Sequence, residues 1–193
     1  MKKILQKKEK VLHRKAREVL VREIQTPKIK KILREMSSAL KSQADGVAIA
    51  APQIGYALRI FVVSGKIMKA EFPLRGVSQA DEPRGSAVPI DTDSGPAKGK
   101  SAVKDLVFIN PKISKLSREK EWVPEGCLSV RWLYGKTFRS KKAVITAYDA
   151  NGKKFTRGAS GLLAQIFQHE TDHLNGILFI DHAKDIKEEL PKN

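Results

Sequence analysis

QHETDHLNG, residues 168–176, is the stretch that decides how the rest of the chain is interpreted. His169 and His173 are four residues apart, so on an α-helix both imidazoles lie on one face, one turn apart. Two neutral imidazoles in this register can hold a divalent metal, and Glu170, about 100° around the helix, would handle the proton of a water bound to it. The alternative is a helix that carries two histidines by chance. The chain has only 4 His in 193 residues, so two of them in this register are rarely expected by chance.

The residues before this stretch predict the helix on which it lies. Apolar side chains recur at helical spacing between Ser160, an expected N-cap, and Gly176, an expected C′ glycine. They are Leu162, Leu163, Ile166, Phe167 and Leu174. The helix is therefore expected to be mostly buried, and polar groups inside it need partners, which a metal with its water would supply.

Length and composition place the chain among globular proteins. The 193 residues suit one domain spanning 1–193 with a sizeable core. No apolar run approaches the roughly 20 residues of a membrane span, and the basic N-terminus lacks the apolar segment of a secretory signal. The single cysteine, Cys127, cannot form an internal disulfide, which favours a reducing compartment. We therefore expect a cytoplasmic protein with no membrane partner.

The charge is strongly positive. A formal net charge of +16 favours polyanionic partners, of which RNA is the commonest large one in a cytoplasm. Residues 1–41 concentrate the charge, with 14 Lys or Arg against 4 Glu. The ribosome or its RNA is the partner we expect, and the alternative is a solvated basic surface without a specific partner.

The first third of the chain is mainly helical and apolar in pattern. Residues 1–25 fit either an amphipathic helix or an extended arm, and the pattern does not decide between them. Thr26–Pro27 is a cap followed by a first-turn proline, and the stripe after it predicts a helix over 28–42. Residues 46–55 are small and apolar and should pack tightly, and 58–63 predict a buried strand.

The middle of the chain loses this pattern. Residues 66–104 carry no periodicity and several prolines, which is typical of a mobile insertion. After them we expect strands at 105–109, ended by Asn110–Pro111, at 143–148, followed by a turn at 149–152, and at 177–180.

A catalytic site with two histidines needs a third protein ligand and an open position. A downstream Glu or His would serve, and so would the thiolate of Cys127, which lies on a short polar turn between strand signals. Spacing alone leaves this choice open, and cysteine is more often a small buried hydrophobe than a ligand.

Three motifs together resemble the signatures of peptide deformylases, in that family's order. They are GVAIAAPQIG at 46–55, EGCLS at 125–129 and QHETDHL at 168–174. The resemblance covers about residues 4–63 and 105–182. H-E-x-x-H alone would leave any zincin-like hydrolase open, whereas the three motifs together are specific.

The resemblance implies a role for each matching residue. Cys127, His169 and His173 match the metal ligands, and Glu170 matches the general acid/base. Gln53 and the Leu128 N–H match the donors to the formyl oxygen. The metal implied is Fe²⁺, with Zn²⁺, Ni²⁺ or Co²⁺ able to take its place.

The implied reaction removes the N-formyl group from the initiator methionine of a nascent polypeptide and releases formate. The substrate would add as a strand beside 46–49, and the expected substrate-binding residues are Gly46, Ala48, Ile49 and Gly126. Arg139 falls where the family carries an arginine able to pair with Asp172, which would orient the metal helix.

The chain also departs from the family pattern. Ala48 and Ile49 replace a usual glycine and leucine, Arg131 replaces a usual proline, and Tyr134 stands where an arginine is frequent. The stretch 73–100 has no counterpart in compact members. These departures concern substrate preference and rate more than the metal site.

Two other functions remain open from sequence. A zincin-type peptidase would use a downstream Glu or His as third ligand and would not need Cys127. A ribosome- or RNA-binding protein that has lost efficient turnover would fit the charge of +16 and Ala48. For every one of these functions the expected fold class is α+β, with short mixed and antiparallel strands around a central metal-binding helix.

Overall fold

The computed structural model describes residues 2–67 and 104–190. Almost all of the predicted insertion at 66–104 lies outside these residues. In chain order the elements are η1 (Lys10–His13), η2 (Val21–Glu23), α1 (Pro27–Lys41), β1 (Ala48–Ala50), η3 (Ala51–Ile54), β2 (Ile60–Val63), β3 (Leu106–Leu116), β4 (Lys120–Gly126), β5 (Leu133–Ser140), β6 (Lys142–Tyr148), β7 (Lys154–Ser160), α3 (Gly161–Leu174), η4 (Phe179–Asp181) and β8 (Lys184–Glu188).

Two sheets account for the described strands. The first has five strands in the order β1-β2-β3-β6-β7, and the second has three in the order β4-β5-β8. Every pairing between these strands is antiparallel. The parallel contact in the described chain is an isolated bridge between Arg17 and Leu58, so the mixed pairing that we expected is limited to it. The α+β class is confirmed.

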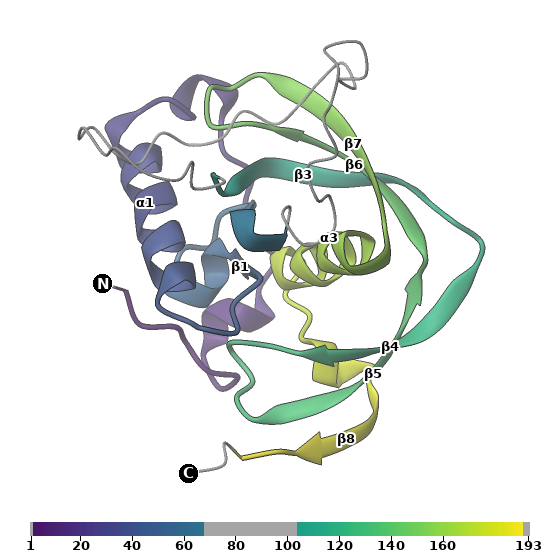
Figure 1. Ribbon diagram of the computed structural model, residues 1–193. Coiled ribbons are helices and arrows are strands. Elements are labelled where there is room, and N and C mark those ends of the chain that lie inside the picture. The colour runs from purple at the N-terminus through teal and green to yellow at the C-terminus, as the bar shows by residue number, and fades with distance from the viewer. Residues whose placement is uncertain (1, 68–103, 191–193) are drawn as a thin grey trace, which may run out of the picture.

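Helix α3 lies between the two sheets (Figure 1). It contacts β1, β3, β6 and β7 of the first sheet and β5 of the second. Phe167 projects from α3 onto Phe108 of β3, with ring centroids 5.2 Å apart, and Phe108 stacks on Phe61 of β2 at 4.5 Å. This aromatic cluster fixes the helix against the sheet by burying large apolar surfaces in defined geometries.

Helix α1 covers the opposite face of the first sheet. Because side chains alternate along a strand, Phe61 and Phe108 face α3, whereas Val62 and Val107 belong to the cluster that packs on α1. The helix predicted at 28–42 is confirmed, with Thr26 as N-cap accepting a hydrogen bond from the Ile29 N–H. Both sheet faces are therefore covered, which explains the continuous burial of β2 and the start of β3.

The N-terminal residues form an extended arm with two short 3₁₀ helices, which resolves the choice that the sequence left open. The arm is bound by backbone hydrogen bonds from Leu5 N to Gln53 O (2.8 Å) and from Ala16 N to Leu174 O (2.9 Å). It passes the end of α3 so closely that a Cβ at Gly176 would lie 2.8 Å from the Arg14 nitrogen. Glycine is required there for space, and its φ of +79° requires it as well.

Two strand predictions were wrong. Asn110–Pro111 does not end a strand, because β3 continues to Leu116 through a register shift. Asn110 takes a φ of 51° there and exchanges two hydrogen bonds with the backbone of Val19 through its side-chain amide. Residues 177–180 do not form a strand either, since a 3₁₀ helix holds Phe179 in the core.

The last strand is β8, in a tail that the sequence left without a prediction. It is fully exposed and pairs with the edge of β5. In the described part of the chain, no helix is long and apolar enough to cross a membrane.

Candidate active site

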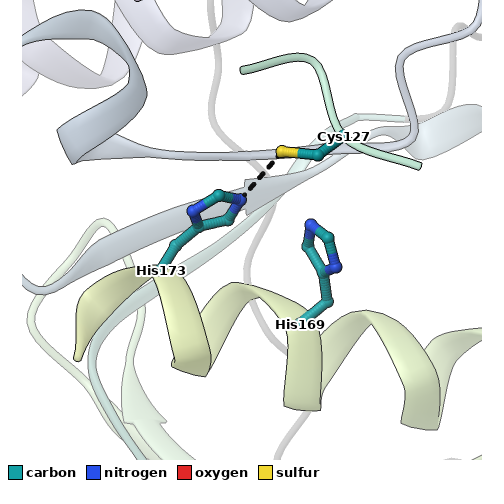
Figure 2. A group of neighbouring side chains, drawn as sticks. All are labelled: Cys127, His169 and His173. Carbon is teal, nitrogen blue, oxygen red and sulfur yellow. Dashed lines mark hydrogen bonds between the residues drawn. The ribbon is translucent and has the colours of Figure 1, made fainter. Parts of the chain in front are cut away.

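The site is built where the turn after β4 meets the last two turns of α3. Cys127 comes from the turn, and His169 and His173 come from one face of the helix (Figure 2). The potential ligand atoms of the three residues all lie within 4.8 Å of one another, and Cys127 Sγ is 3.1 Å from His173 Nε2. The two predicted histidines and the distant thiol are therefore brought together.

This donor set fits a divalent transition metal. One thiolate and two imidazoles at this mutual separation are the kind of three-ligand set that leaves a position open for water or substrate. His169 Nδ1 is 3.1 Å from Glu125 Oε2, so its Nε2 is the nitrogen left for an ion. A carboxylate on the outer nitrogen of a ligating histidine is the usual way to fix its ring and tautomer.

Electrostatics favour the thiolate form of Cys127. Burial raises the pKa of the thiol, but the neighbouring His173 and His169 outweigh burial and lower it to about 5. For His169, burial lowers the pKa, but hydrogen bonds with Cys127 and Glu125 raise it well above its ordinary value. The negative charges of Cys127 and Glu125, which favour the protonated form of His169, also favour a cation bound at this site.

Glu125 is a residue of the site for which we predicted no role from the sequence. Its carboxylate accepts two hydrogen bonds from Arg139, at 2.8 and 3.0 Å, besides its contact with His169. Arg139 donates a further bond to Asp172 of α3 at 2.6 Å, so the predicted Arg139–Asp172 pair is confirmed. The only sequence signal was the position of Glu125 two residues before Cys127 in the EGCLS motif.

Glu170 lies beside the ligand cluster with its side chain buried. Burial raises the pKa of its carboxyl to about 7, although His169 and His173 act in the opposite direction. Within the described residues its Oε2 has no hydrogen-bond partner. A carboxyl in this state is suited to take up and release a proton near neutral pH.

Hydrogen bonds hold the Gln53 side chain in one orientation beside Cys127. Its Oε1 accepts from the Ala50 N–H at 2.7 Å, which turns the Nε2 group toward Ser129 Oγ (3.1 Å) and Cys127 Sγ (3.5 Å). Leu128 follows Cys127 directly, and no acceptor for its N–H is found within the described residues. Both donors therefore lie next to the thiol.

A cavity of about 310 Å³ opens beside this cluster. Among its lining residues are most of those predicted from sequence, namely Ala48, Gln53, Gly126, Cys127, Leu128, His169 and Glu170. Three predicted residues do not line it. His173 is buried behind the thiol, Ile49 points into the core cluster on the α1 side, and a Cβ at Gly46 would meet Leu40 of α1 at 2.9 Å.

Among the described strands, β1 is at the edge of the five-stranded sheet, and it borders the cavity. Ala48 is in this strand, and its φ is not positive, so alanine does not strain the backbone at this position. Ala48 lines the cavity and also belongs to the buried cluster that packs on α3. Ala48 remains a residue that narrows the cleft beside the strand edge.

Arg131 and Tyr134, two departures from the family pattern, also line the cavity. Arg131 pairs with Asp45 at 2.6 and 3.1 Å and so joins the turn after β4 to the loop before β1. Tyr134 covers Gly126, where an added Cβ would lie 2.8 Å from the tyrosine ring. The glycine of the EGCLS motif is therefore needed for this close contact.

The sequence profile of polypeptide deformylase matches residues 1–189. The chain belongs to the peptide deformylase family. It is 35% identical to peptide deformylase 2 of Clostridium acetobutylicum over 173 residues, which cover 90% of this chain and 89% of that protein. The peptide deformylase 1A of Arabidopsis thaliana, named chloroplastic/mitochondrial, is 36% identical over 89% of this chain and 57% of its own length.

Solved deformylase structures have the same fold. A class I type b peptide deformylase from Acinetobacter baumannii, crystallised with Met-Ala-Ser, superposes with a TM-score of 0.71 at 25% identity and covers 94% of this chain and 99% of its own. The family resemblance drawn from three motifs is thus confirmed over nearly the whole chain.

Proposed function

We infer that this peptide deformylase removes the N-formyl group from the initiator methionine of nascent polypeptides. The observation that carries the inference is the convergence of one thiol, two imidazoles and a buried carboxyl at the end of a cleft. Deformylases are metal-dependent, and we propose that Cys127, His169 and His173 hold the ion. The same cluster argues against a zincin-type peptidase, which would leave the thiol without a role.

The identity of the ion follows from the family rather than from the ligands. We propose Fe²⁺, with Zn²⁺, Ni²⁺ or Co²⁺ as functional replacements, because a thiolate with two imidazoles accepts all four. When bound, such an ion lowers the pKa of a coordinated water toward neutrality and polarises a carbonyl. Metal analysis of protein purified without oxygen distinguishes the ions.

The protein residues divide the rest of the chemistry. Gln53 Nε2 and the Leu128 N–H donate hydrogen bonds to the formyl oxygen as negative charge develops on it. Glu170 accepts a proton from the attacking water and donates a proton to the amine nitrogen as the C–N bond breaks. Formate and a free N-terminal methionine are the products.

The substrate backbone is proposed to lie along β1 as an added strand. Strand β1 is at the sheet edge and lines the cleft, so its free backbone groups can pair with an extended peptide. The outward-facing backbone of Gly46 and Ala48 would supply these bonds, Ile49 would hold the strand on β2 beside them, and Gly126 would lie across the cleft. The methionine side chain would enter the part of the cavity lined by Leu162 and Ile166 of α3.

Three wider proposals accompany this function. We propose that residues 1–193 form one deformylase domain, that the protein acts in the cytoplasm, and that it meets its substrate at the ribosome. The charge of +16 supports the last of these, since ribosomal RNA is a polyanion.

A turnover assay tests the function. Formate release is measured with formyl-Met-Ala-Ser, and cleavage of unformylated Met-Ala-Ser is measured in parallel. We expect formate only from the first peptide and no peptide-bond cleavage in either. Cleavage of the unformylated peptide would support a peptidase instead, and no reaction with either would support a protein that only binds.

A further inference from the structure

The outer face of the three-stranded sheet continues from the cleft. In the β4–β5 pair, Trp122 is opposite Phe138 and Gly126 is opposite Tyr134. Residues at even spacing on a strand share a face, so all four lie on one side of the sheet. Gly126 and Tyr134 line the cleft. The surface around Trp122 and Phe138 therefore continues from the cleft along β4 and β5, the two strands that lie side by side in Figure 1.

Two large aromatic rings are exposed side by side on this face. Trp122 is 44% exposed and Phe138 is 51% exposed, with ring centroids 5.2 Å apart and planes inclined by 36°. The pair belongs to none of the three apolar clusters of the core. Adjacent exposed rings are unusual on a surface without a partner.

Lysines surround the two rings. Lys184 Nζ lies 4.8 Å from the centre of the Trp122 ring, and Lys120 Nζ lies 5.8 Å from that of Phe138. Lys136 lies on the same face. Its ion pair with Asp185, at 3.4 Å, joins two exposed side chains, so the pair restrains Lys136 only weakly. We call Trp122, Phe138 and these three lysines the aromatic–lysine face.

We propose that the aromatic–lysine face binds single-stranded RNA. Unpaired bases stack on exposed rings regardless of sequence, and phosphates on either side of them need cations. An ammonium group above a ring still exposes N–H donors, and exposed lysine side chains can move aside for a base within nanoseconds. Charge complementarity favours RNA, because an apolar protein partner would have to desolvate three ammonium groups to reach the rings.

The acidic side chains of β4 support this assignment, and Asp185 of β8 is the carboxylate that reaches the face within the described residues, through its pair with Lys136. Glu121 is opposite Arg139, so it lies on the other face, away from the rings. The net charge of +16 adds a long-range attraction for any polyanion. This inference gains a role if the proposed deformylation occurs at the ribosome. Ribosomal RNA bound to the aromatic–lysine face would then hold the adjoining cleft close to the nascent chain.

The test uses the full chain and a fluorescein-labelled single-stranded RNA of about twelve nucleotides, within the usual site size for such surfaces. Anisotropy titrations are run at several salt concentrations. One variant combines Trp122→Ala with Phe138→Ala. A second combines Lys120→Gln, Lys136→Gln and Lys184→Gln.

A matched control removes three exposed lysines elsewhere, with the same loss of charge. It combines Lys28→Gln, Lys30→Gln and Lys31→Gln on the surface of α1. Formate release from formyl-Met-Ala-Ser is measured for all variants, because none of the substituted residues lines the cleft, and unchanged activity shows that each protein is folded.

We expect the aromatic variant to bind RNA at least about tenfold more weakly, the loss of one stacked base. The three-lysine variant on the face should lower the slope of log affinity against log salt by about two, since each lost phosphate contact contributes about 0.7. The α1 control should change both quantities less.

Three results would overturn the proposal. They are equal weakening by the α1 control, RNA binding that does not change in the aromatic variant, and ring-dependent binding to phosphatidylserine vesicles that is tighter than binding to RNA. RNA binding is measured without substrate, so any of these three results would leave the proposed deformylase function untouched. A protein that binds RNA but releases no formate would instead contradict the deformylase function and leave the RNA proposal untouched.

Discussion

The two sides of the cleft are held in different ways. On the ligand side, formed by α3 and β4, Glu125 and Arg139 are 3% and 9% exposed in their side chains and are joined by two hydrogen bonds. On the substrate side, formed by β1 and the loop before it, the corresponding ion pair joins Asp45 to Arg131, and the Asp45 side chain is 57% exposed. Charge pairs that are buried and fully bonded are costly to break, whereas exposed ones contribute little.

This difference explains where the chain departs from its family. Ala48, Arg131 and Tyr134 all lie on the substrate side or at the cleft mouth. On the ligand side, Glu125 of the EGCLS motif satisfies two other buried polar groups, Arg139 and His169. Substitutions on the ligand side should therefore have large effects on metal and turnover, and those on the substrate side should have small ones.

The largest effect is expected for the two histidines. His169→Ala and His173→Ala should each lose bound metal and all detectable formate release, since two protein ligands do not hold a catalytic ion of this kind tightly. The metal is measured by mass spectrometry of the purified protein. His13→Ala, at an exposed histidine that does not line the cleft, is the control and should retain both.

A smaller but still large effect is expected for Glu125→Gln. The change keeps the size of the side chain but weakens its bonds to Arg139 and His169, so metal affinity should fall by about 10- to 100-fold. Competition with a chelator measures the affinity. Glu121→Gln, four residues earlier on β4 in an exposed ion pair with Lys141, should leave it unchanged. Equal affinities in both variants would show that Glu125 does not orient the ligand.

The smallest effect is expected on the substrate side, at Ala48→Gly. Removing the methyl group from the cleft should raise kcat/KM on formyl-Met peptides at constant metal content, by no more than about 1 to 3 kcal/mol in transition-state binding. Glycine weakens a strand by about 0.5 to 1 kcal/mol, so a thermal unfolding curve is recorded with the kinetics. An equal or lower kcat/KM would mean that the methyl group fills a wider cleft.

Local signals in the sequence were enough for the helices and for most strands. The apolar spacing, Ser160 and Gly176 predicted α3, and its burial is confirmed. Strand β8 could not be predicted, because it is polar and exposed and forms only through pairing with β5. The end of β3 was misplaced since Asn110 usually signals a turn, but here tertiary bonds to Val19 hold it within the strand.

The site was predictable only in part for a similar reason. Spacing on one helix found His169 and His173, whereas the approach of Cys127 depends on the fold, and the family resemblance supplied it. The role of Glu125 depends on the three-dimensional meeting of β4, β5 and α3, and no local pattern reports it. Ile49 was assigned to the substrate because of its motif, but alternation along β1 turns its side chain into the core.

The central claim is that Cys127 completes a metal site at which Glu170 moves the proton. The most direct measurement compares bound metal and formate release from formyl-Met-Ala-Ser in Cys127→Ser and Glu170→Ala. We expect Cys127→Ser to lose both, and Glu170→Ala to keep its metal while turnover falls by about 10²- to 10⁴-fold. Full metal and activity in Cys127→Ser, or normal turnover in Glu170→Ala, would contradict it.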